Sequence, residues 1–421
     1  MKLRKLGIIG AAGALAISAA VPALAQAPED PLGVVAIPAG EPIHVGFWGV
    51  LSGADGSLGT DSLHGVELAV DAVGGKLLDR DIQLTSEDGL CTPEGGATAA
   101  QKLAADTTLV GLIGPSCSDE VVGGIAALTA AGLTTISPSA TRPTLTAPDR
   151  DASYAGFLRT AHSDAFQGLA VANWAYESGI RKAATIHDGS AYAEALQQVF
   201  ADAFTELGGE ITVQEAVTKG QTDMHSVLTT IAATSPELIY LPIFTAEGAF
   251  IVAQSSEVAG LENVKMAGSD GIFNPDFIKA AGPNVEGFFL SSPDFTKFAA
   301  GYADLLAAYK AKYGADPTAV FHAHAYDATG ILFAALEKVA TTDADGTTYI
   351  PKGALRDAIY ATKDYPGIIG NLTCSPTGDC GSPAIAIYEV SAEDAANGTI
   401  PTVPVWPTSD AGASPAASPA G

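Results

Sequence analysis

Basic residues are scarce in this chain of 421 residues. Lys and Arg together number 21, against 47 Asp and Glu, which gives a formal net charge of −26 at pH 7. Proteins that bind nucleic acid or an anionic membrane surface usually present a basic face, so this composition argues against both partners. We interpret the acidic surface as a source of solubility, and it does not imply that a ligand is a cation.

Long apolar runs are also missing beyond the N-terminus. Three basic residues within positions 2–5 precede the apolar run 6–20, and Ala23 and Ala25 are small residues at the two positions that a signal peptidase reads. This order is typical of a secretory signal peptide, and the run is too short for a convincing permanent membrane span. We expect residues 1–25 to be removed and the mature protein to be periplasmic, without a lipid anchor because no cysteine follows the cleavage site closely.

Cysteine is rare, with only Cys91, Cys117, Cys374 and Cys380 in the chain. An even number in an exported protein favours two disulfides. Four cysteines permit three pairings, of which the simplest joins the near neighbours Cys374 and Cys380 and leaves Cys91 with Cys117. A zinc site is the alternative, but the chain has no CxxC pair and no histidine at ligand spacing beside these cysteines.

Catalytic and cofactor motifs are missing too. The chain has no G-x-S-x-G nucleophile elbow, no G-x-x-x-x-G-K-[ST] phosphate loop and no H-E-x-x-H zinc motif. The run Gly53, Gly56, Gly59 does not have dinucleotide-binding spacing. His322 and His324 stand two apart in a predicted helix and so point to different faces. We therefore expect no cofactor, no metal and no enzymatic activity.

What the chain does have is a repeating alternation of short apolar segments with helical ones. Segment starts are roughly 25 to 30 residues apart, the length of one β-α unit, and about 395 residues after cleavage favour two domains. Such alternation predicts an α/β fold with parallel sheets covered on both faces. The predicted strands are 43–51, 82–86, 108–113, 133–137, 183–186, 211–217, 238–243, 264–267 and 287–290.

Both ends of the predicted mature chain have a different composition. Residues 26–40 and 396–421 are rich in Pro, Ala, Gly and Ser. Such segments bury too little apolar surface to fold firmly, so we expect a flexible N-terminal segment and a disordered tail. Near the C-terminus, residues 370–381 suggest a hairpin pinned by Cys374 and Cys380.

Polar side chains follow several predicted strands, where open α/β sheets bind ligands. Ser116 and Ser118 follow one strand, and Ser118 lies at the start of a helix, where backbone N–H groups and the helix dipole favour an anion. Asp270 follows another strand and supplies the opposite charge. This combination suits a zwitterion such as an amino acid. Taken singly, each residue is more simply an N-cap or a turn former.

Several longer segments match one known family. They are Leu51-Ser52-Gly53, Gly65-Val66-Glu67-Leu68-Ala69, Gly114-Pro115-Ser116-Cys117-Ser118, Ser137-Pro138-Ser139-Ala140-Thr141-Arg142-Pro143, Phe157-Leu158-Arg159-Thr160 with Gln167-Gly168, and Ile186-His187-Asp188 with Tyr192. In combination they resemble the leucine/isoleucine/valine-binding protein family, the type I periplasmic solute-binding proteins of ABC transporters. The resemblance covers residue 43 to about residue 290, and the C-terminal third matches less well.

The resemblance implies two Rossmann-like lobes with parallel sheets, joined by a three-crossover hinge and closing on a ligand. Lobe one would comprise residues 41–161 and 291–381, and lobe two residues 162–290 and 382–395. It also implies that Cys91 pairs with Cys117.

The resemblance further implies roles in ligand binding. Ser118 and Thr141 would hold the ligand carboxylate, while the Ser139 carbonyl, the Thr141 hydroxyl and Asp270 would hold the ammonium group. Ala140 lies within the same segment and joins the predicted ligand-binding set. Tyr192 would close over the ligand from lobe two.

The chain departs from the family at four positions near the ligand side chain or its ammonium group. Leu58 stands where many relatives have an aromatic residue, and Phe244 with Glu247 replaces a tyrosine-rich strand end. Asp270 stands where branched-chain binders often have Glu. These differences leave an α-amino-acid head group expected and the side-chain specificity open.

We therefore expect a monomeric substrate-binding component of an ABC importer, with a small amino-acid-like ligand and a membrane permease as partners. One alternative is a ligand-sensing receptor module of the same fold for another solute, such as an amide or γ-aminobutyrate. A more remote alternative is an amide or ester hydrolase, which would need His187 as a base near Ser116 or Ser118.

Overall fold

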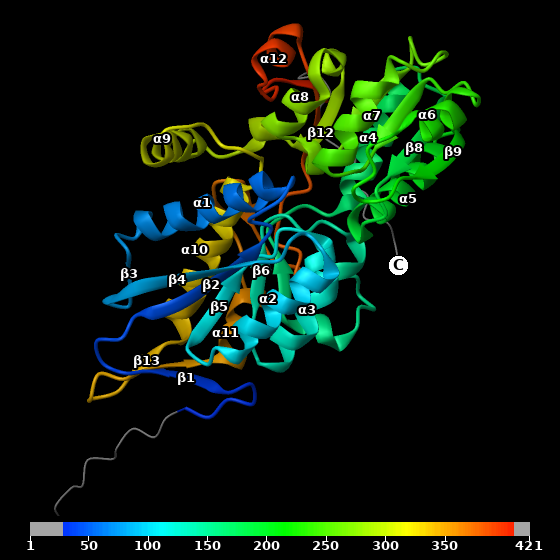
Figure 1. Ribbon diagram of the computed structural model, residues 1–421. Coiled ribbons are helices and arrows are strands. Elements are labelled where there is room, and N and C mark those ends of the chain that lie inside the picture. The colour runs from blue at the N-terminus through cyan, green and yellow to red at the C-terminus, as the bar shows by residue number, and fades with distance from the viewer. Residues whose placement is uncertain (1–27, 408–421) are drawn as a thin grey trace, which may run out of the picture.

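The computed structural model describes residues 28–407, which form two α/β lobes stacked one above the other (Figure 1). Lobe one contains a six-stranded sheet in the order β3-β4-β2-β5-β6-β7. Its strands are β2 (Ile43–Gly49), β3 (Lys76–Leu77), β4 (Arg80–Asp88), β5 (Leu109–Ile113), β6 (Thr135–Ser137) and β7 (Phe157–Arg159). The central strand β2 is buried along its whole length, as expected for a parallel strand covered on both faces.

The helices of lobe one lie on both faces of this sheet. On one face α1 packs against α10, and on the other α2 packs against α3. Sequence signals start these helices: Thr92 caps α2 through the N–H of Gly95, with Pro93 as its first residue, a favoured pairing. The helices of lobe one are α1 (Gly56–Ala72), α2 (Pro93–Ala105), α3 (Ser118–Ala130), α9 (Tyr302–Tyr313), α10 (His322–Val339) and α11 (Lys352–Tyr360).

Lobe two contains a seven-stranded sheet in the order β18-β17-β12-β11-β10-β8-β9. Its strands are β8 (Lys182–His187), β9 (Glu210–Ala216), β10 (Leu238–Leu241), β11 (Lys265–Gly268), β12 (Phe289–Pro293), β17 (Ile385–Glu389) and β18 (Pro404–Trp406), and its helices are α4 (Asp164–Glu177), α5 (Ala191–Glu206), α6 (His225–Ala232), α7 (Thr245–Ser255), α8 (Pro275–Ala281) and α12 (Ala392–Asn397). The α/β fold with parallel sheets is confirmed, although β17 and β18 add an antiparallel edge and β3 pairs antiparallel with β4.

The chain passes between the lobes three times: after β7, after β12 and before β17. The predicted boundary between residues 290 and 291 is wrong, because β12 continues to Pro293 in the lobe-two sheet. The strand is longer than its apolar sequence suggests, since the buried Ser291 and Ser292 belong to it.

Part of the expected flexible N-terminal segment is an ordered strand. β1 (Val34–Ile37) pairs antiparallel with β14 (Thr348–Pro351), which also pairs with β13 (Thr341–Thr342). The side chains of Val35 and Ile37 are buried, and this burial outweighs the flanking Gly and Pro. The predictions for residues 1–25 fall outside the described residues.

Part of the expected tail is ordered as well. Residues 396–407 include the end of α12 and the strand β18, and Trp406 donates its indole N–H to Glu177 at 2.7 Å. The rest of the tail, residues 408–421, falls outside the described residues.

The hairpin predicted within residues 370–381 lies earlier in the chain. It is formed by β15 (Tyr365–Gly367) and β16 (Gly370–Leu372), and the Cys374–Cys380 disulfide closes the loop that follows. That loop packs on Arg159 at the end of β7. The Arg159 N–H donates to the Gly378 carbonyl at 2.9 Å, the Cys380 N–H donates to the Arg159 carbonyl at 2.9 Å, and the guanidinium pairs with Asp379.

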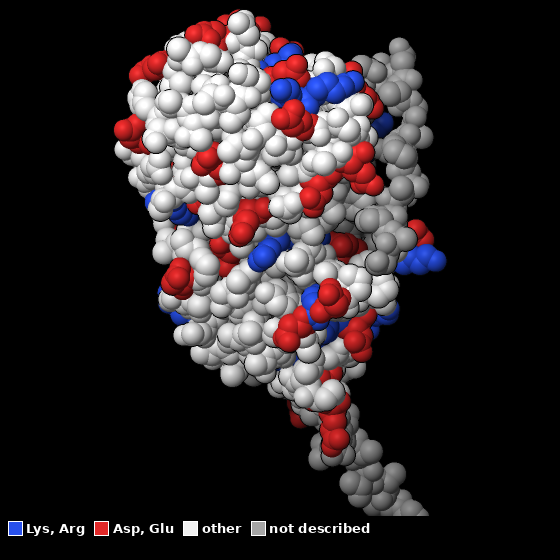
Figure 2. Space-filling model, turned by 90° about the vertical axis from the view of Figure 1, so that its right-hand side faces the viewer, with Lys and Arg blue, Asp and Glu red and all other residues white. Residues whose placement is uncertain are grey.

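The surface keeps the acidic character of the sequence. On the face shown in Figure 2, acidic side chains are scattered over the molecule and basic ones form no broad patch. Within residues 28–407 we find no helix of the length and apolar character needed to cross a membrane.

Candidate ligand-binding site

A small cavity of about 10 Å³ lies between the two lobes. We call it the cleft cavity, and its lining combines hydroxyls, one carboxylate and apolar side chains from loops that follow strands of both sheets. The lining residues are Leu58, Ser116, Cys117, Ser118, Ser139, Tyr192, Phe244, Asp270, Gly271 and Phe321. This volume is about enough for one water molecule, so a solute needs the lobes to move apart before it can enter.

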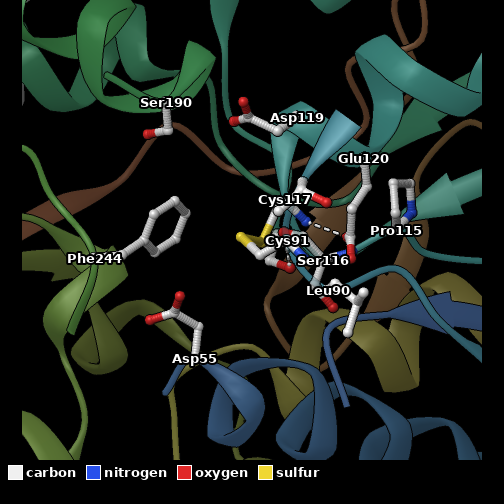
Figure 3. Close-up of a disulfide and its surroundings, with 12 residues drawn as sticks. Asp55, Leu90, Cys91, Pro115, Ser116, Cys117, Asp119, Glu120, Ser190 and Phe244 are labelled. Carbon is white, nitrogen blue, oxygen red and sulfur yellow. Dashed lines mark hydrogen bonds between the residues drawn. A yellow bond between two sulfur atoms is a disulfide. The ribbon is translucent and has the colours of Figure 1, made fainter. Parts of the chain in front are cut away.

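The lobe-one wall is held in place by a buried carboxylate (Figure 3). Glu120 accepts the backbone N–H groups of Ser116 and Cys117 at 3.0 and 2.8 Å through one oxygen, and that of Cys91 at 3.1 Å through the other. It thus fixes both ends of the Cys91–Cys117 disulfide, which is present as predicted. Burial raises the pKa of Glu120 to about 7, although the three N–H bonds act to lower it.

The hydroxyls of this wall are oriented by neighbouring backbone. Ser118 Oγ accepts the Arg142 N–H at 3.2 Å, so its own hydrogen is free to donate. Ser118 is also the first residue of α3, where backbone N–H groups favour an anion. Ser139 Oγ donates to the Ser116 carbonyl at 2.8 Å, which ties the two strand-end loops together.

The lobe-two wall is centred on Asp270. Tyr192 donates its phenolic O–H to Asp270 Oδ1 at 2.6 Å, and Ser269 Oγ lies 2.7 Å from the same phenolic oxygen. His162 Nε2 lies 3.5 Å from Asp270 Oδ2. Burial, followed by the charge of Asp270, raises the pKa of Tyr192 well above its usual value, so the phenol remains a donor. This wall therefore offers a carboxylate for a cation.

The remaining wall is apolar. Leu58 at the start of α1, Phe244 before α7 and Phe321 before α10 line it, together with the half-cystine Cys117. Figure 3 shows the Phe244 ring on the opposite side of the gap from the disulfide. Phe321 is fixed through its N–H, which donates to Asp61 at 3.0 Å. Such a wall suits an aliphatic group.

Two lobe-one aspartates reach across the cleft to helix N-termini of lobe two. Asp119 accepts the Ala191 N–H with both oxygens at 3.1 Å, and Asp55 accepts the Thr245 N–H at 3.2 Å. These residues begin α5 and α7, so the carboxylates also meet the positive ends of two helix dipoles. Burial is the main cause that raises the pKa of both aspartates. We call these two contacts the closure contacts, because they exist only when the lobes are together.

Six of the residues predicted for the site line the cleft cavity. They are Ser118, Ser139, Tyr192, Asp270, Leu58 and Phe244.

Three other predicted residues are buried but do not line the cavity. Ala140 donates its N–H to Ser137 Oγ, and the Thr141 carbonyl accepts the Asp164 N–H. Glu247 was predicted for the side-chain pocket, but its carboxylate accepts the Gly220 N–H at 2.6 Å. Glu247 is not among the residues that line the cavity.

Sequence reasoning missed Phe321 and His162. Phe321 lies in the third of the chain where the family motifs were weak, and no local pattern marks it. His162 stands between the matched Arg159-Thr160 and Gln167-Gly168, so its position beside two matched segments is the signal that could have found it.

Comparison with known proteins identifies the family of this chain. A family model described as periplasmic binding protein matches residues 42–397. The Leu/Ile/Val-binding protein homolog 3 of Brucella melitensis is 28% identical over 82% of this chain and 91% of its own length. The Leu/Ile/Val-binding protein of Escherichia coli is 26% identical over 71% of this chain and 80% of its own length.

Solved structures share the fold. One is a branched-chain amino acid transporter substrate-binding protein of Streptococcus pneumoniae in complex with isoleucine, with a TM-score of 0.74, 24% identity, and coverage of 86% of this chain and 98% of its own. Another is a solute-binding protein from R. palustris in complex with benzoate, with a TM-score of 0.70, 21% identity, and coverage of 83% and 93%. The match of the family model over most of the sequence shows that the chain belongs to the periplasmic binding protein family.

Proposed function

We propose that the protein is the substrate-binding component of an ABC importer and that it binds a small aliphatic α-amino acid in the cleft cavity. The observation that carries this proposal is the pairing of a hydroxyl-bearing helix N-terminus on one wall with a buried carboxylate on the other, beside an apolar wall. Relatives named as Leu/Ile/Val-binding proteins, which match over most of their length, support the ligand class.

In this proposal the ligand is held by its charged ends. Its carboxylate lies at Ser118 and the N-terminus of α3, and Thr141 supports that end from behind. Its ammonium group lies against Asp270, whose orientation Tyr192 fixes by a hydrogen bond of 2.6 Å, and against the Ser139 carbonyl. The aliphatic side chain then faces Leu58, Phe244 and Phe321. Removing one partner leaves the other buried and unsatisfied, a penalty of about 1–3 kcal/mol or more for charged groups.

Ligand binding drives closure in the proposed cycle. Contacts made from both walls favour the closed arrangement, so the ligand shifts the population toward it. The closed protein then binds a membrane permease on the periplasmic side and delivers the solute to it. No catalytic step is part of this cycle.

The alternatives are less well supported. The benzoate complex of the same fold has an aromatic acid as its ligand, which has no ammonium group to match the carboxylate of Asp270. A hydrolase would need His187 near Ser116 or Ser118, but His187 is not among the residues that line the cleft cavity, and its Nδ1 accepts the Gly189 N–H at 3.1 Å.

Thermal unfolding of the mature, ligand-stripped protein tests the proposal across a panel of amino acids, amides, γ-aminobutyrate and aromatic carboxylates. A ligand that binds only the folded state raises the midpoint, by about 2.7 kcal/mol of stability at a hundredfold excess over Kd. We expect leucine, isoleucine or valine to raise it for wild type. Asp270→Asn should lose this shift, and Asp276→Asn, which alters an exposed carboxylate in the same lobe, should retain it. A shift from other solutes alone would overturn the proposal.

A further inference from the structure

Asp379 lies outside the cleft cavity, yet its carboxylate is bonded to the interior of lobe one. It belongs to the loop that the Cys374–Cys380 disulfide closes. One carboxylate oxygen accepts the Nε–H of Arg159, and the other accepts the Thr146 hydroxyl at 2.9 Å. The Asp379 side chain is 39% exposed, whereas that of Arg159 is 0% exposed. The carboxylate thus reaches a cation in the core of the lobe from the surface.

Arg159 uses a second nitrogen to hold the segment that we assign to the ligand carboxylate. Its Nη1 donates to the carbonyl oxygens of Ala140 and Arg142 at 3.2 and 2.9 Å. The Ala140 carbonyl shares a planar trans peptide group with the Thr141 N–H, so the two point in opposite directions. The Arg142 N–H in turn donates to Ser118 Oγ at 3.2 Å. Arg159 therefore sets the direction of the Thr141 N–H and holds the residue that orients the Ser118 hydroxyl.

Residues 139–142 belong to no helix or strand that would hold them. They follow the end of β6 and precede a short 3-10 turn. Ser137 Oγ accepts the N–H groups of Ser139 and Ala140 at 3.3 and 2.9 Å, which supports the first half of the segment. Carbonyls on both sides of the second half are bonded to the guanidinium of Arg159. The position of that side chain therefore decides how firmly the segment is fixed.

The guanidinium keeps its position while its charge is balanced. An arginine stays protonated in proteins, and a charge buried without a partner is costly. Two carbonyl oxygens and the Thr146 hydroxyl, 2.7 Å from Nη2, are neutral acceptors. Within residues 28–407, the carboxylate in a salt bridge with Arg159 is that of Asp379. Because the guanidinium is planar and rigid, holding Nε at Asp379 also fixes where Nη1 points.

We infer that Asp379 is a positioning residue of the binding site: it holds Arg159 in place, and Arg159 holds residues 139–142 where the ligand carboxylate binds. This inference rests on the proposed function. Asp379 itself is not among the residues that line the cleft cavity, so it acts on the ligand through Arg159. The disulfide-closed loop thereby takes part in binding, since its Gly378 and Cys380 are bonded to the Arg159 backbone and bring Asp379 to the guanidinium.

Leucine and leucinamide together test this role, because leucinamide keeps the ammonium group and the side chain but has an amide in place of the carboxylate. The affinity for each follows from the rise of the thermal midpoint with ligand concentration. In Asp379→Ala the ratio of leucine affinity to leucinamide affinity should fall about fivefold, the effect of one lost hydrogen bond. A purely structural role would weaken the binding of both ligands alike and leave the ratio unchanged.

Asp343→Ala is the matched control. Asp343 is also a half-buried residue of lobe one, and both of its carboxylate oxygens are bonded. They accept the N–H groups of Asp345 and Thr347 and the Tyr349 hydroxyl, all within the hairpin of β13 and β14. We expect Asp343→Ala to have a lower thermal midpoint without ligand and an affinity ratio equal to that of wild type.

Amide hydrogen exchange of the ligand-free proteins tests the inference without a ligand. Residues 139–142 should exchange about fivefold faster in Asp379→Ala than in wild type, and at the wild-type rate in Asp343→Ala. An unchanged affinity ratio, or unchanged exchange of this segment, in Asp379→Ala would refute the inference. Failure of wild type to bind any amino acid would overturn the proposed function instead, even where faster exchange shows that Asp379 fixes the segment.

Discussion

Replacing Asp119 with alanine should weaken ligand binding while leaving both lobes folded. The carboxylate belongs to lobe one, yet the partner of both its oxygens is the Ala191 N–H at the start of α5 in lobe two. The contact exists only in the closed arrangement, so its loss raises the free energy of that arrangement alone. The open arrangement, with Asp119 in water, is unaffected.

The size of the effect follows from the geometry of a helix N-cap. Losing a side-chain acceptor at a helix N-terminus costs about 0.5–2 kcal/mol. Burial of the Asp119 carboxylate, which raises its pKa, costs free energy and offsets part of the energy of its hydrogen bonds. We therefore take about 1 kcal/mol as the net free energy lost from the closed arrangement. This corresponds to an affinity about fivefold lower, because 1.4 kcal/mol is a factor of ten. Titration calorimetry with the best amino acid of the panel measures it directly.

Ser190→Ala is the matched control. Ser190 caps the same helix from within lobe two, by accepting the Ala193 N–H at 3.2 Å, so its loss affects open and closed arrangements equally. We expect a lower thermal midpoint and an unchanged Kd for Ser190→Ala, and the reverse pattern for Asp119→Ala. An Asp119→Ala protein that binds as tightly as wild type, or a Ser190→Ala protein that binds as weakly as Asp119→Ala, would contradict the reasoning.

Three further predictions concern the walls of the cleft cavity. Glu120 has a pKa of about 7 in the folded protein and near 4.5 in the unfolded chain, so between these pH values the folded state binds one proton more than the unfolded state. The contribution of Glu120 to the unfolding free energy therefore falls by about 1.4 kcal/mol per pH unit as the pH rises through that window. Urea unfolding of Glu120→Gln at several pH values should lack this fall. Changing Cys91 and Cys117 to serine opens a loop with a sequence separation of 26, so urea unfolding should show a loss of about 3.5 kcal/mol, and an unchanged unfolding free energy would contradict this. Phe321→Ala enlarges the space beside the apolar wall, so the ratio of phenylalanine affinity to valine affinity, measured by calorimetry, should rise. A fall in this ratio would show that the Phe321 ring does not limit the size of the ligand side chain.

The sequence predicted those elements well whose own residues form a recognisable hydrophobic pattern. The apolar strands β2, β5 and β8 could be identified because buried parallel strands are continuous apolar runs. β1 and β18 could not, because each is short, flanked by Gly or Pro, and ordered only by a partner strand far away or late in the chain. The local composition of a short strand does not show which distant strand it will pair with.

The candidate site divides in the same way. Ser118 and Asp270 could be found because ligand sites follow strand ends, a rule that needs only the strand positions. Phe321 could not, since it lies in the third of the chain where the family motifs were weak and no local pattern marks it. Glu247 could not be placed either, because its partner Gly220 belongs to another loop.

The loop closed by Cys374 and Cys380 lies beside two of the three crossovers that join the lobes. It is bonded to Arg159 immediately before the first crossover and ends immediately before the third. At Gly381 a Cβ atom would lie 2.2 Å from the Thr160 carbonyl oxygen and 2.5 Å from that of Ala161, so the two crossing strands touch backbone to backbone. They leave lobe one as one closely packed pair, so we expect the lobes to bend at the residues beyond it. A side chain at position 381 would push these two crossover segments apart and change the angle between the lobes, at a position outside the residues that line the cleft cavity.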